Sequence, residues 1–197
     1  MKYIFIILTL LLPSSCTLLP PVKPGVGTTY VLCATPKYVP EKKSHASTIL
    51  VMSPDANPTY NTTQMAYTTK PFQIAYFSEN SWAETPPQMF HPLIVQALQN
   101  THYFNAVIIP PFAGRYDYAL ITQIIALQQD FTCRPALLKL KMRAQLSKTA
   151  SHEVIATQDF VVHIPFTQRT PYAGVIAANQ ATEQVLKQIA AFSVQHT

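Results

Sequence analysis

The chain has 197 residues, of which 48% are hydrophobic and 12% charged, a composition that suits one globular domain with a sizeable core. Its 14 basic and 9 acidic residues give a net charge of +5, but the basic residues are spread along the chain, which argues against a nucleic-acid-binding stripe. Four glycines against 17 prolines predict few left-handed backbone positions and many rigid loops.

The N-terminus has the pattern of a bacterial lipoprotein signal. A lysine precedes an apolar run, residues 4–12, that is too short to span a bilayer comfortably, and Ser14 and Ser15 stand before Cys16. In such a signal the cysteine thiol receives a diacylglycerol and becomes the new N-terminus. We therefore expect residues 1–16 to be a signal that ends at a lipidated Cys16. A plain secreted protein or an uncleaved anchor is the alternative, because Pro13 departs from the usual motif.

The residues that follow the cysteine predict how the domain is held. Residues 17–27, TLLPPVKPGVG, have the composition of a short, proline-stiffened tether, and residues 28–197 are expected to form a single domain. Thr17 takes the place of the aspartate that retains enterobacterial lipoproteins at the inner membrane. Its presence favours the periplasmic face of the outer membrane of a Gram-negative bacterium.

Two further cysteines remain once Cys16 carries lipid. Cys33 and Cys133 form an even pair in an oxidising periplasm, which makes them a candidate disulfide. The alternative is that Cys33 is a small, buried apolar residue at the end of a strand. No CxxC or HxxxH spacing occurs, so we expect no metal site and no cofactor.

The first half of the chain predicts short strands and one helix. Residues 28–32 and 48–52 are β-rich runs, and residues 63–69 and 72–76 alternate around a tight turn, as in a hairpin. Thr85 is placed to cap a helix that opens on two prolines. Pro92 lies beyond the first turn, so we expect a kink or a regular helix that begins only near Gln88. The apolar stripe of this helix is Met89, Phe90, Leu93, Ile94, Ala97 and Leu98.

The second half predicts three long strands and a final helix. A strand at residues 107–109 precedes the segments 117–131, 136–148 and 153–165, whose short polar connectors indicate an antiparallel meander. The mixed alternation of the first long segment suggests that both its faces are covered near the middle. On the second, Lys139, Lys141 and Arg143 alternate with apolar residues and should lie on a solvated face. On the third, the apolar face is predicted to hold Val154, Ala156, Phe160, Val162 and Ile164.

The last helix begins near Pro171. Its expected apolar stripe is Ala177, Ala181, Val185, Ile189 and Phe192. Two one-sided helices and a sheet with one cleaner apolar face predict an α+β two-layer sandwich: a mixed, mostly antiparallel sheet with both helices on one side.

Catalytic patterns are absent from the sequence. It has no GxSxG elbow, no phosphate loop and no GxGxxG, and none of His91, His102 and His163 has a carboxylate or a nucleophile near it in sequence. The lone tryptophan, Trp82, either fills the core where the hairpin meets the first helix or, with Tyr76, belongs to a surface that contacts a partner or lipid cargo.

The order of these features resembles the auxiliary lipoprotein family of ABC transporters, the paraquat-inducible lipoprotein C-like family, over about residues 28–195. The most specific part runs from Met65-Ala66-Tyr67 through Trp82-Ala83-Glu84, with support from Asp117-Tyr118 and Gln129-Asp130-Phe131. The resemblance implies a fold like the N-terminal domain of the translocation protein TolB. It also implies a place beside Mce-type transporters, in which a permease, an ATPase and periplasmic Mce-domain proteins move phospholipid or other hydrophobic molecules between the membranes.

Three hypotheses for function follow. The first is a non-enzymatic lipoprotein, anchored at the outer membrane, that serves an Mce-type ABC transport system, with phospholipid contact and a homo-oligomer both left open. The second is a lipoprotein scaffold or pilot for another cell-envelope complex. The third is an envelope hydrolase built from dispersed residues. The proteins encoded by neighbouring genes would distinguish the first hypothesis from the second. Substrate turnover that a histidine substitution abolishes would favour the third.

Overall fold

The computed structural model describes residues 27–36 and 45–197, so the expected signal and Cys16 lie outside the described residues. Its elements are β1 (Thr28–Tyr30), β2 (His45–Val51), β3 (Asp55–Ala56), η1 (Pro58–Tyr60), β4 (Gln64–Thr68), β5 (Ala75–Trp82), α2 (Pro86–Gln99), β6 (Phe104–Ile108), β7 (Tyr118–Asp130), β8 (Ala136–Lys148), β9 (Glu153–Phe166) and α3 (Pro171–Gln195). A mixed sheet with two helices against it confirms the predicted α+β class.

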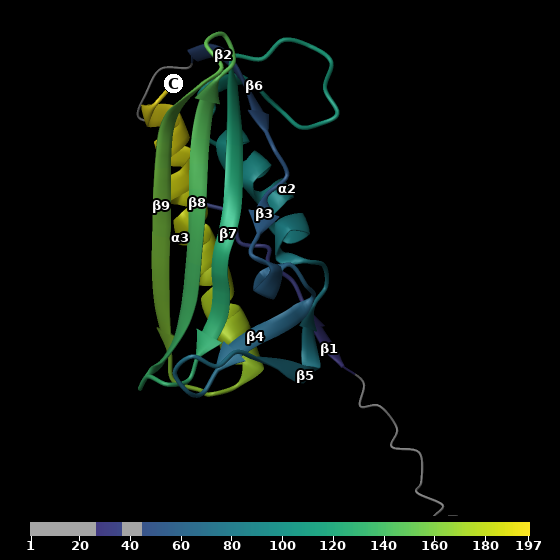
Figure 1. Cartoon of the computed structure of the whole chain (residues 1–197), viewed down its shortest axis with the longest axis vertical. Helices are drawn as coiled ribbons and strands as arrows, with labels where there is room; N and C mark the ends of the chain where they lie inside the picture. Colours follow the sequence, from purple (N-terminus) through teal and green to yellow (C-terminus); the bar gives the residue numbers. More distant parts are fainter. Residues whose placement is uncertain (1–26, 37–44) are drawn as a thin grey trace, which may run out of the picture.

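The long axis of the molecule is set by the meander of β7, β8 and β9, which pair antiparallel along their whole lengths (Figure 1). The short strands assemble on the other edge of β7. There β2, β3 and β4 pair with it one after another, all parallel, at Tyr118, Gln123 and Gln128 respectively. A single long strand therefore aligns three short ones. β6 extends the sheet beside β2, while β5 and β1 extend it beside β4.

A β-bulge explains the mixed alternation of β7. Ile124 pairs with Met142 and Ala126 with Lys141, so Ile125 is an extra residue without a partner on β8. Since side chains alternate with period two, one extra residue moves the buried set from even to odd numbers. Leu120 and Ile124 are buried before the bulge, and Leu127 and Gln129 after it.

A second bulge corrects one prediction for β9. Leu146 pairs with Ala156 but Ser147 pairs with Val154, which leaves Ile155 as the extra residue. Val154 therefore lies opposite Ser147, on the solvent side, and is exposed rather than part of the apolar face. Phe160 and Val162 are buried as predicted.

Helix α2 begins at Pro86, so the expected later start near Gln88 is wrong. The backbone amide and the hydroxyl of Thr85 donate to Oε1 of Gln88, at 3.1 and 2.8 Å, and the prolines at the first positions have no amide that needs a partner. Pro92 stands inside the helix. The predicted stripe is confirmed, since all six of its members are buried.

Helix α3 starts after Thr170, whose hydroxyl accepts the amide of Ala173 at 3.2 Å. Its predicted stripe is buried throughout. α3 packs against β8 and β9 and contacts α2, and side chains from both helices and the sheet form one continuous core. Figure 1 shows α3 behind the meander and α2 next to it. Within the described part of the chain, no helix covers the other face of the meander (Figure 1).

Asn179 of α3 holds the chain that follows β1. Its Oδ1 accepts the amides of Cys33 and Ala34 at 2.9 and 3.2 Å, and its Nδ2 donates to the carbonyls of Val31 and Val175 at 3.2 and 3.1 Å. These bonds seat the buried Leu32 against the core. Asparagine suits this position because one side chain supplies both donors and acceptors.

We expect Asn179→Ala to lower the free energy of unfolding by about 1–3 kcal/mol, because it leaves half-buried backbone groups without partners. Hydrogen exchange should become faster at the amides of residues 33 and 34. Asn179→Asp, which keeps the acceptor but not the donor, should protect those two amides better than alanine does. Equal exchange in wild type and Asn179→Ala would contradict the assigned bonds.

The open face of the meander carries an ion-pair ladder, which confirms the solvated face predicted for β8. Nζ of Lys139 lies 2.5 Å from Asp130, while Lys141 and Arg143 both contact Asp159, at 3.0 and 2.6 Å. Hydrogen bonds from Arg143 and Lys141 lower the pKa of Asp159 to about 2. Burial raises the pKa of Asp130, but the bonds from Lys139 and Thr132 outweigh it and lower the pKa overall.

Acid should weaken this ladder. A carboxyl whose pKa is lower in the folded than in the unfolded chain stabilises the fold above the unfolded value, here 3.8, and this stabilisation disappears as the pH falls towards about 2. Melting temperatures of the wild type and of Asp159→Asn should therefore differ at neutral pH and converge across that interval. A difference that persists unchanged at the acid end would show that the pair contributes nothing through charge.

Candidate docking surfaces

The aromatic residues singled out from the sequence lie in different environments. Trp82 is only 4% exposed and belongs to the core, so its side chain is not part of a surface in this structure. Tyr76 is exposed, and its hydroxyl donates to the carbonyl of Thr59 at 3.1 Å. It lies near Tyr60, whose pKa is raised by burial and by the proximity of Tyr76. Tyr76 therefore joins β5 to η1 and leaves only part of its ring accessible.

Cys33 and Cys133 are both free cysteines, in contrast to the candidate disulfide. The amide of Cys33 is bound by Asn179, in the middle part of α3. The carbonyl of Cys133 accepts Nη1 of Arg169, which stands before the first turn of the same helix. The residues that hold them are ten positions apart, and the helical part between these, from Pro171 to Asn179, is about 12 Å long.

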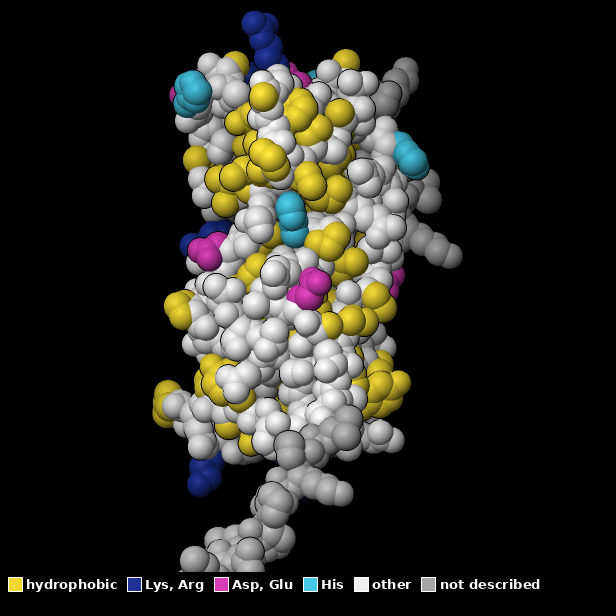
Figure 2. Space-filling view, turned by 90° about the vertical axis from the view of Figure 1, so that its right-hand side faces the viewer, with side chains coloured by type: hydrophobic (Ala, Val, Ile, Leu, Met, Phe, Trp, Pro, Cys, Tyr) yellow, Lys and Arg dark blue, Asp and Glu magenta, His cyan; other side chains and the backbone are white. Residues whose placement is uncertain are grey.

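An exposed apolar surface lies at the upper end, on the loop 109–117 that joins β6 to β7. Figure 2 shows hydrophobic side chains gathered over the upper part of the side that carries β6. We call this the upper loop surface and define it by Met52, Ile109 and Phe112. Ile109 and Phe112 are 48% and 45% exposed. Because Leu50 pairs with Ile108, the strand register brings Met52 beside the start of the loop.

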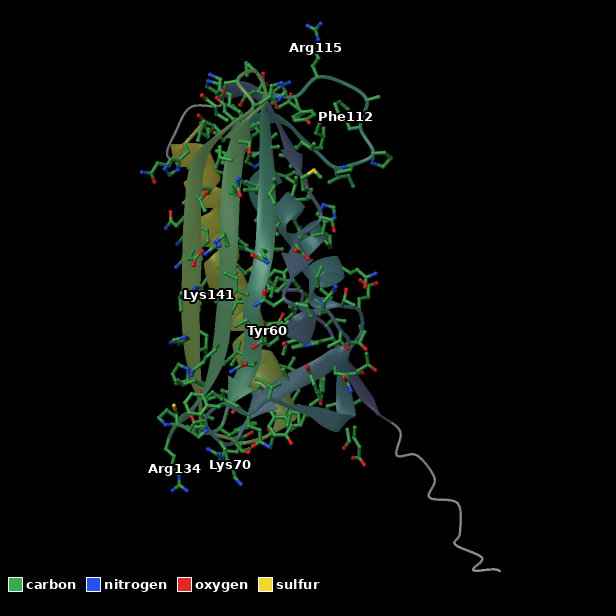
Figure 3. The ribbon with its side chains drawn as sticks, in the orientation of Figure 1. Tyr60, Lys70, Phe112, Arg115, Arg134 and Lys141 are labelled. Atoms are coloured by element: carbon green, nitrogen blue, oxygen red, sulfur yellow. The ribbon has the colours of Figure 1, made fainter. Side chains whose placement is uncertain are left out.

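The upper loop stands away from the sheet but is anchored where it rejoins β7 (Figure 3). Oδ2 of Asp117 accepts the amide of Thr48 at 2.7 Å, and the amide of Asp117 donates to the carbonyl of Thr48 at 2.9 Å. The carbonyl of Asp117 in turn accepts the amide of Thr149. Gly114 lets the ring of Phe112 fold over the loop backbone, since a Cβ at this position would overlap that ring. The loop therefore presents its apolar residues from a fixed base.

A groove of about 470 Å³ lies beside the base of this loop, between the start of β2 and the turn from β8 to β9. Ser47 and Thr149 line it, and among residues 27–36 and 45–197 their buried hydroxyl oxygens have no hydrogen-bond partner. Lys148 and Arg115 supply positive charge at its edge. Because the two hydroxyl oxygens are buried, the polar groups of this groove that another molecule can reach are the exposed side chains of Lys148 and Arg115.

Sequence reasoning missed this surface. Residues 109–113, IPPFA, read as the end of a strand followed by prolines, and neither periodicity nor a motif marks them. The available signal was composition: isoleucine and phenylalanine stand in a proline-rich loop that has no strand or helix to bury them.

The described part of the chain holds neither a metal-ligand cluster nor a membrane-spanning helix. Among residues 27–36 and 45–197, no three His, Cys, Asp or Glu side chains come together as they would around a metal ion. Within the same part of the chain, no helix has the length and apolar character needed to cross a membrane.

The fold defines an α+β domain that exposes apolar residues on the loop between β6 and β7. Comparison with known families identifies it further. The family model of the ABC-type transport auxiliary lipoprotein component matches residues 30–190, and the chain belongs to this family. It is therefore an auxiliary lipoprotein component of ABC transport in the bacterial envelope, as the resemblance implied.

Solved structures support the fold. Protein XCC0632 from Xanthomonas campestris, described as a DUF330 protein, is 19% identical, has a TM-score of 0.79, and the match covers 86% of this chain and 96% of that one. Protein CT253 from Chlamydia trachomatis is 6% identical, with a TM-score of 0.52 over 77% of this chain and 98% of that one. No curated protein matches the sequence.

Proposed function

We propose that this protein is a non-enzymatic lipoprotein, anchored through Cys16 at the periplasmic face of the outer membrane, that docks an Mce-type ABC transport system for phospholipids or other hydrophobic molecules. Membership of the auxiliary family carries the proposal. The partners are a periplasmic Mce-domain protein and, through it, the permease and the ATPase. The upper loop surface is the proposed contact with that protein.

The geometry fits a docking role in two respects. The exposed apolar residues Ile109 and Phe112 have the character of interface anchors, because burying them against a partner removes apolar surface from water. The groove next to them carries the exposed side chains of Lys148 and Arg115 at its edge, which can supply the polar rim of such an interface. A scaffold for another envelope complex is the alternative function, and the same surface would serve it.

The anchor is tested by Cys16→Ala. The variant should move from the membrane fraction to the soluble periplasmic fraction, and the mass of the mature wild-type N-terminus should show added acyl chains that the variant lacks. Separation of the inner and outer membranes by density shows in which of the two the wild-type protein lies. Retention of Cys16→Ala in the membrane with unchanged mass would overturn lipidation at this residue.

The transport role is tested by crosslinking in living cells, capture of the tagged wild-type chain, and mass spectrometry of the proteins and lipids recovered. An Mce-domain protein in the captured fraction would support the proposal, and phospholipid beside it would show contact with cargo. Secretion or peptidoglycan machinery without Mce components would instead favour the scaffold function.

A further inference from the structure

The end of the molecule opposite the upper loop surface has a different chemistry. Three loops lie there together, residues 69–74, 131–135 and 167–170, and we call them the lower tip (Figure 1). We infer that the lower tip lies against the anionic phospholipid surface that holds the chain's own acyl anchor. This inference rests on the proposed anchor at Cys16 and adds to it a defined membrane-facing side.

Phe72 is the first observation. The amide of Gln73 donates to the carbonyl of Lys70, which closes a turn with Pro71 and Phe72 at its centre. Phe72 has a φ of 63°, at the turn position where a positive φ normally calls for glycine. Its ring is fully exposed, at 110%. A bulky aromatic residue in left-handed backbone whose side chain is exposed to water is unfavourable for folding alone, so a role outside the fold is indicated.

Charge is the second observation. Each of the three loops contains one basic residue, Lys70, Arg134 or Arg169, and none contains an acidic one. Lys70 and Arg134 are exposed and point away from the sheet at the lower end (Figure 3). The nearest carboxyl on β7, that of Asp130, is buried and paired with Lys139. The lower tip therefore presents uncompensated positive charge around an exposed aromatic ring, the combination that binds anionic membrane interfaces.

The tip is also held as one unit. Nη1 of Arg169 donates to the carbonyl of Cys133 at 3.3 Å and Nη2 to that of Phe131 at 2.5 Å, while its guanidinium lies 5.0 Å from the centre of the Phe131 ring. The amide of Phe131 donates to the carbonyl of Thr68, at the base of the hairpin. These contacts connect all three loops, so Lys70, Phe72 and Arg134 can meet one surface together.

The attachment point gives the third observation. The described chain begins at Gly27, just before β1, and β1 lies in the lower part of the molecule (Figure 1). Ten residues separate Gly27 from Cys16, and a stretch of that length spans at most about 35–40 Å. The 13 residues of β7 alone extend about 43 Å towards the upper loop surface. The tether therefore favours an orientation with the lower tip at the membrane.

The test uses the full acylated chain in vesicles of phosphatidylethanolamine and phosphatidylglycerol that contain brominated phospholipid, which quenches nearby indole fluorescence. Phe72→Trp is compared with Phe112→Trp, a matched exposed phenylalanine at the opposite end. Wild type supplies the background from the buried Trp82. We expect the emission of Phe72→Trp to shift to shorter wavelength on the vesicles and to be quenched by the brominated lipid. The emission of Phe112→Trp should be the same in brominated and in unbrominated vesicles.

Separate variants test the basic residues of the lower tip and the aromatic ring of Phe72. In the Phe72→Trp background, Lys70→Glu with Arg134→Glu should reduce the quenching to the level seen in phosphatidylcholine vesicles, because each basic residue near an anionic surface strengthens binding about fivefold. Arg115→Glu with Lys148→Glu, at the upper end, should leave it unchanged. Phe72→Gly should keep or raise the melting temperature, since glycine tolerates the positive φ, which shows that the ring is not needed for the fold.

The outcomes separate this inference from the proposed anchor. Chains that float with the vesicles while Phe72→Trp is not quenched, or while Phe112→Trp is quenched instead, would overturn the membrane-facing tip and leave the anchor standing. Chains that fail to float would overturn both. Loss of a captured protein partner in Phe72→Asp, without quenching of Phe72→Trp, would assign the tip to a protein and overturn the lipid assignment.

Discussion

Trp82→Ala is expected to lower the free energy of unfolding by about 3–5 kcal/mol, the usual cost of removing a large aromatic side chain from a core. Trp82 ends β5, pairs with Tyr30 of β1, and donates its amide to the carbonyl of Thr63 at 2.7 Å. Trp82 is 4% exposed and lies at the end of β5, four residues before α2. Since domains of this kind are stable by about 5–15 kcal/mol, the variant should lose a large part of its stability.

Unfolding in denaturant followed by circular dichroism measures this loss, because the substitution removes the chain's only tryptophan and with it the intrinsic fluorescence probe. Trp82→Phe, which retains most of the apolar contact, should cost clearly less than alanine. A Trp82→Ala protein that is as stable as wild type but fails to capture its partner would move the residue from the core to a functional surface.

The elements that could be predicted are those whose pattern is local. The apolar stripes of α2 and α3 repeat at helical spacing, and β8 alternates strictly from Ala136 to Leu146. The sequence of each of these elements therefore shows which of its sides is buried. The caps at Thr85 and Thr170 are local for the same reason.

Pairing partners and bulges are not local. Nothing in residues 45–51, 55–56 or 64–68 says that all three strands pair with β7, because that arrangement depends on the whole sheet. The extra residues Ile125 and Ile155 are apolar like their neighbours, so the sequence does not mark where the faces reverse; in β7 the reversal shows only as a mixed alternation. Because of the reversal at Ile155, the prediction from alternation places Val154 on the wrong side of the sheet.

The candidate surfaces show the same limit. Aromatic character drew attention to Trp82 and Tyr76, yet Trp82 fills the core and Tyr76 is tied to Thr59. Ile109, Phe112 and Phe72 look no different in sequence from residues that become buried. Only the position of their loops, beyond both ends of the meander, leaves them exposed.

The two ends together suggest how the domain works. A membrane-facing lower tip would place the upper loop surface about 40 Å above the bilayer, since β7 spans most of the distance between them. The stiff three-stranded meander would then act as a spacer that fixes the height at which a periplasmic partner is met.

Phe112→Asp is expected to reduce capture of the partner by about 30- to 1,000-fold, the range that corresponds to loss of a central interface anchor. A carboxylate at this position would have to be buried without a partner in the complex, which adds a desolvation cost to the lost apolar contact. The fold should be unaffected because the side chain is exposed in the free protein. Quantitative mass spectrometry of crosslinked, captured complexes measures the effect, with melting temperatures recorded in parallel.

Val161→Asp is the matched control. Val161 is 53% exposed on β9, on the open face opposite Lys141, and belongs to neither the upper loop surface nor the lower tip. Introducing the same charge there should leave capture unchanged. Equal loss in both variants would mean that added charge, rather than the surface it enters, weakens the complex. Full capture by Phe112→Asp would move the docking site away from the upper loop, and the groove lined by Ser47 and Thr149 would then have to be tested on its own.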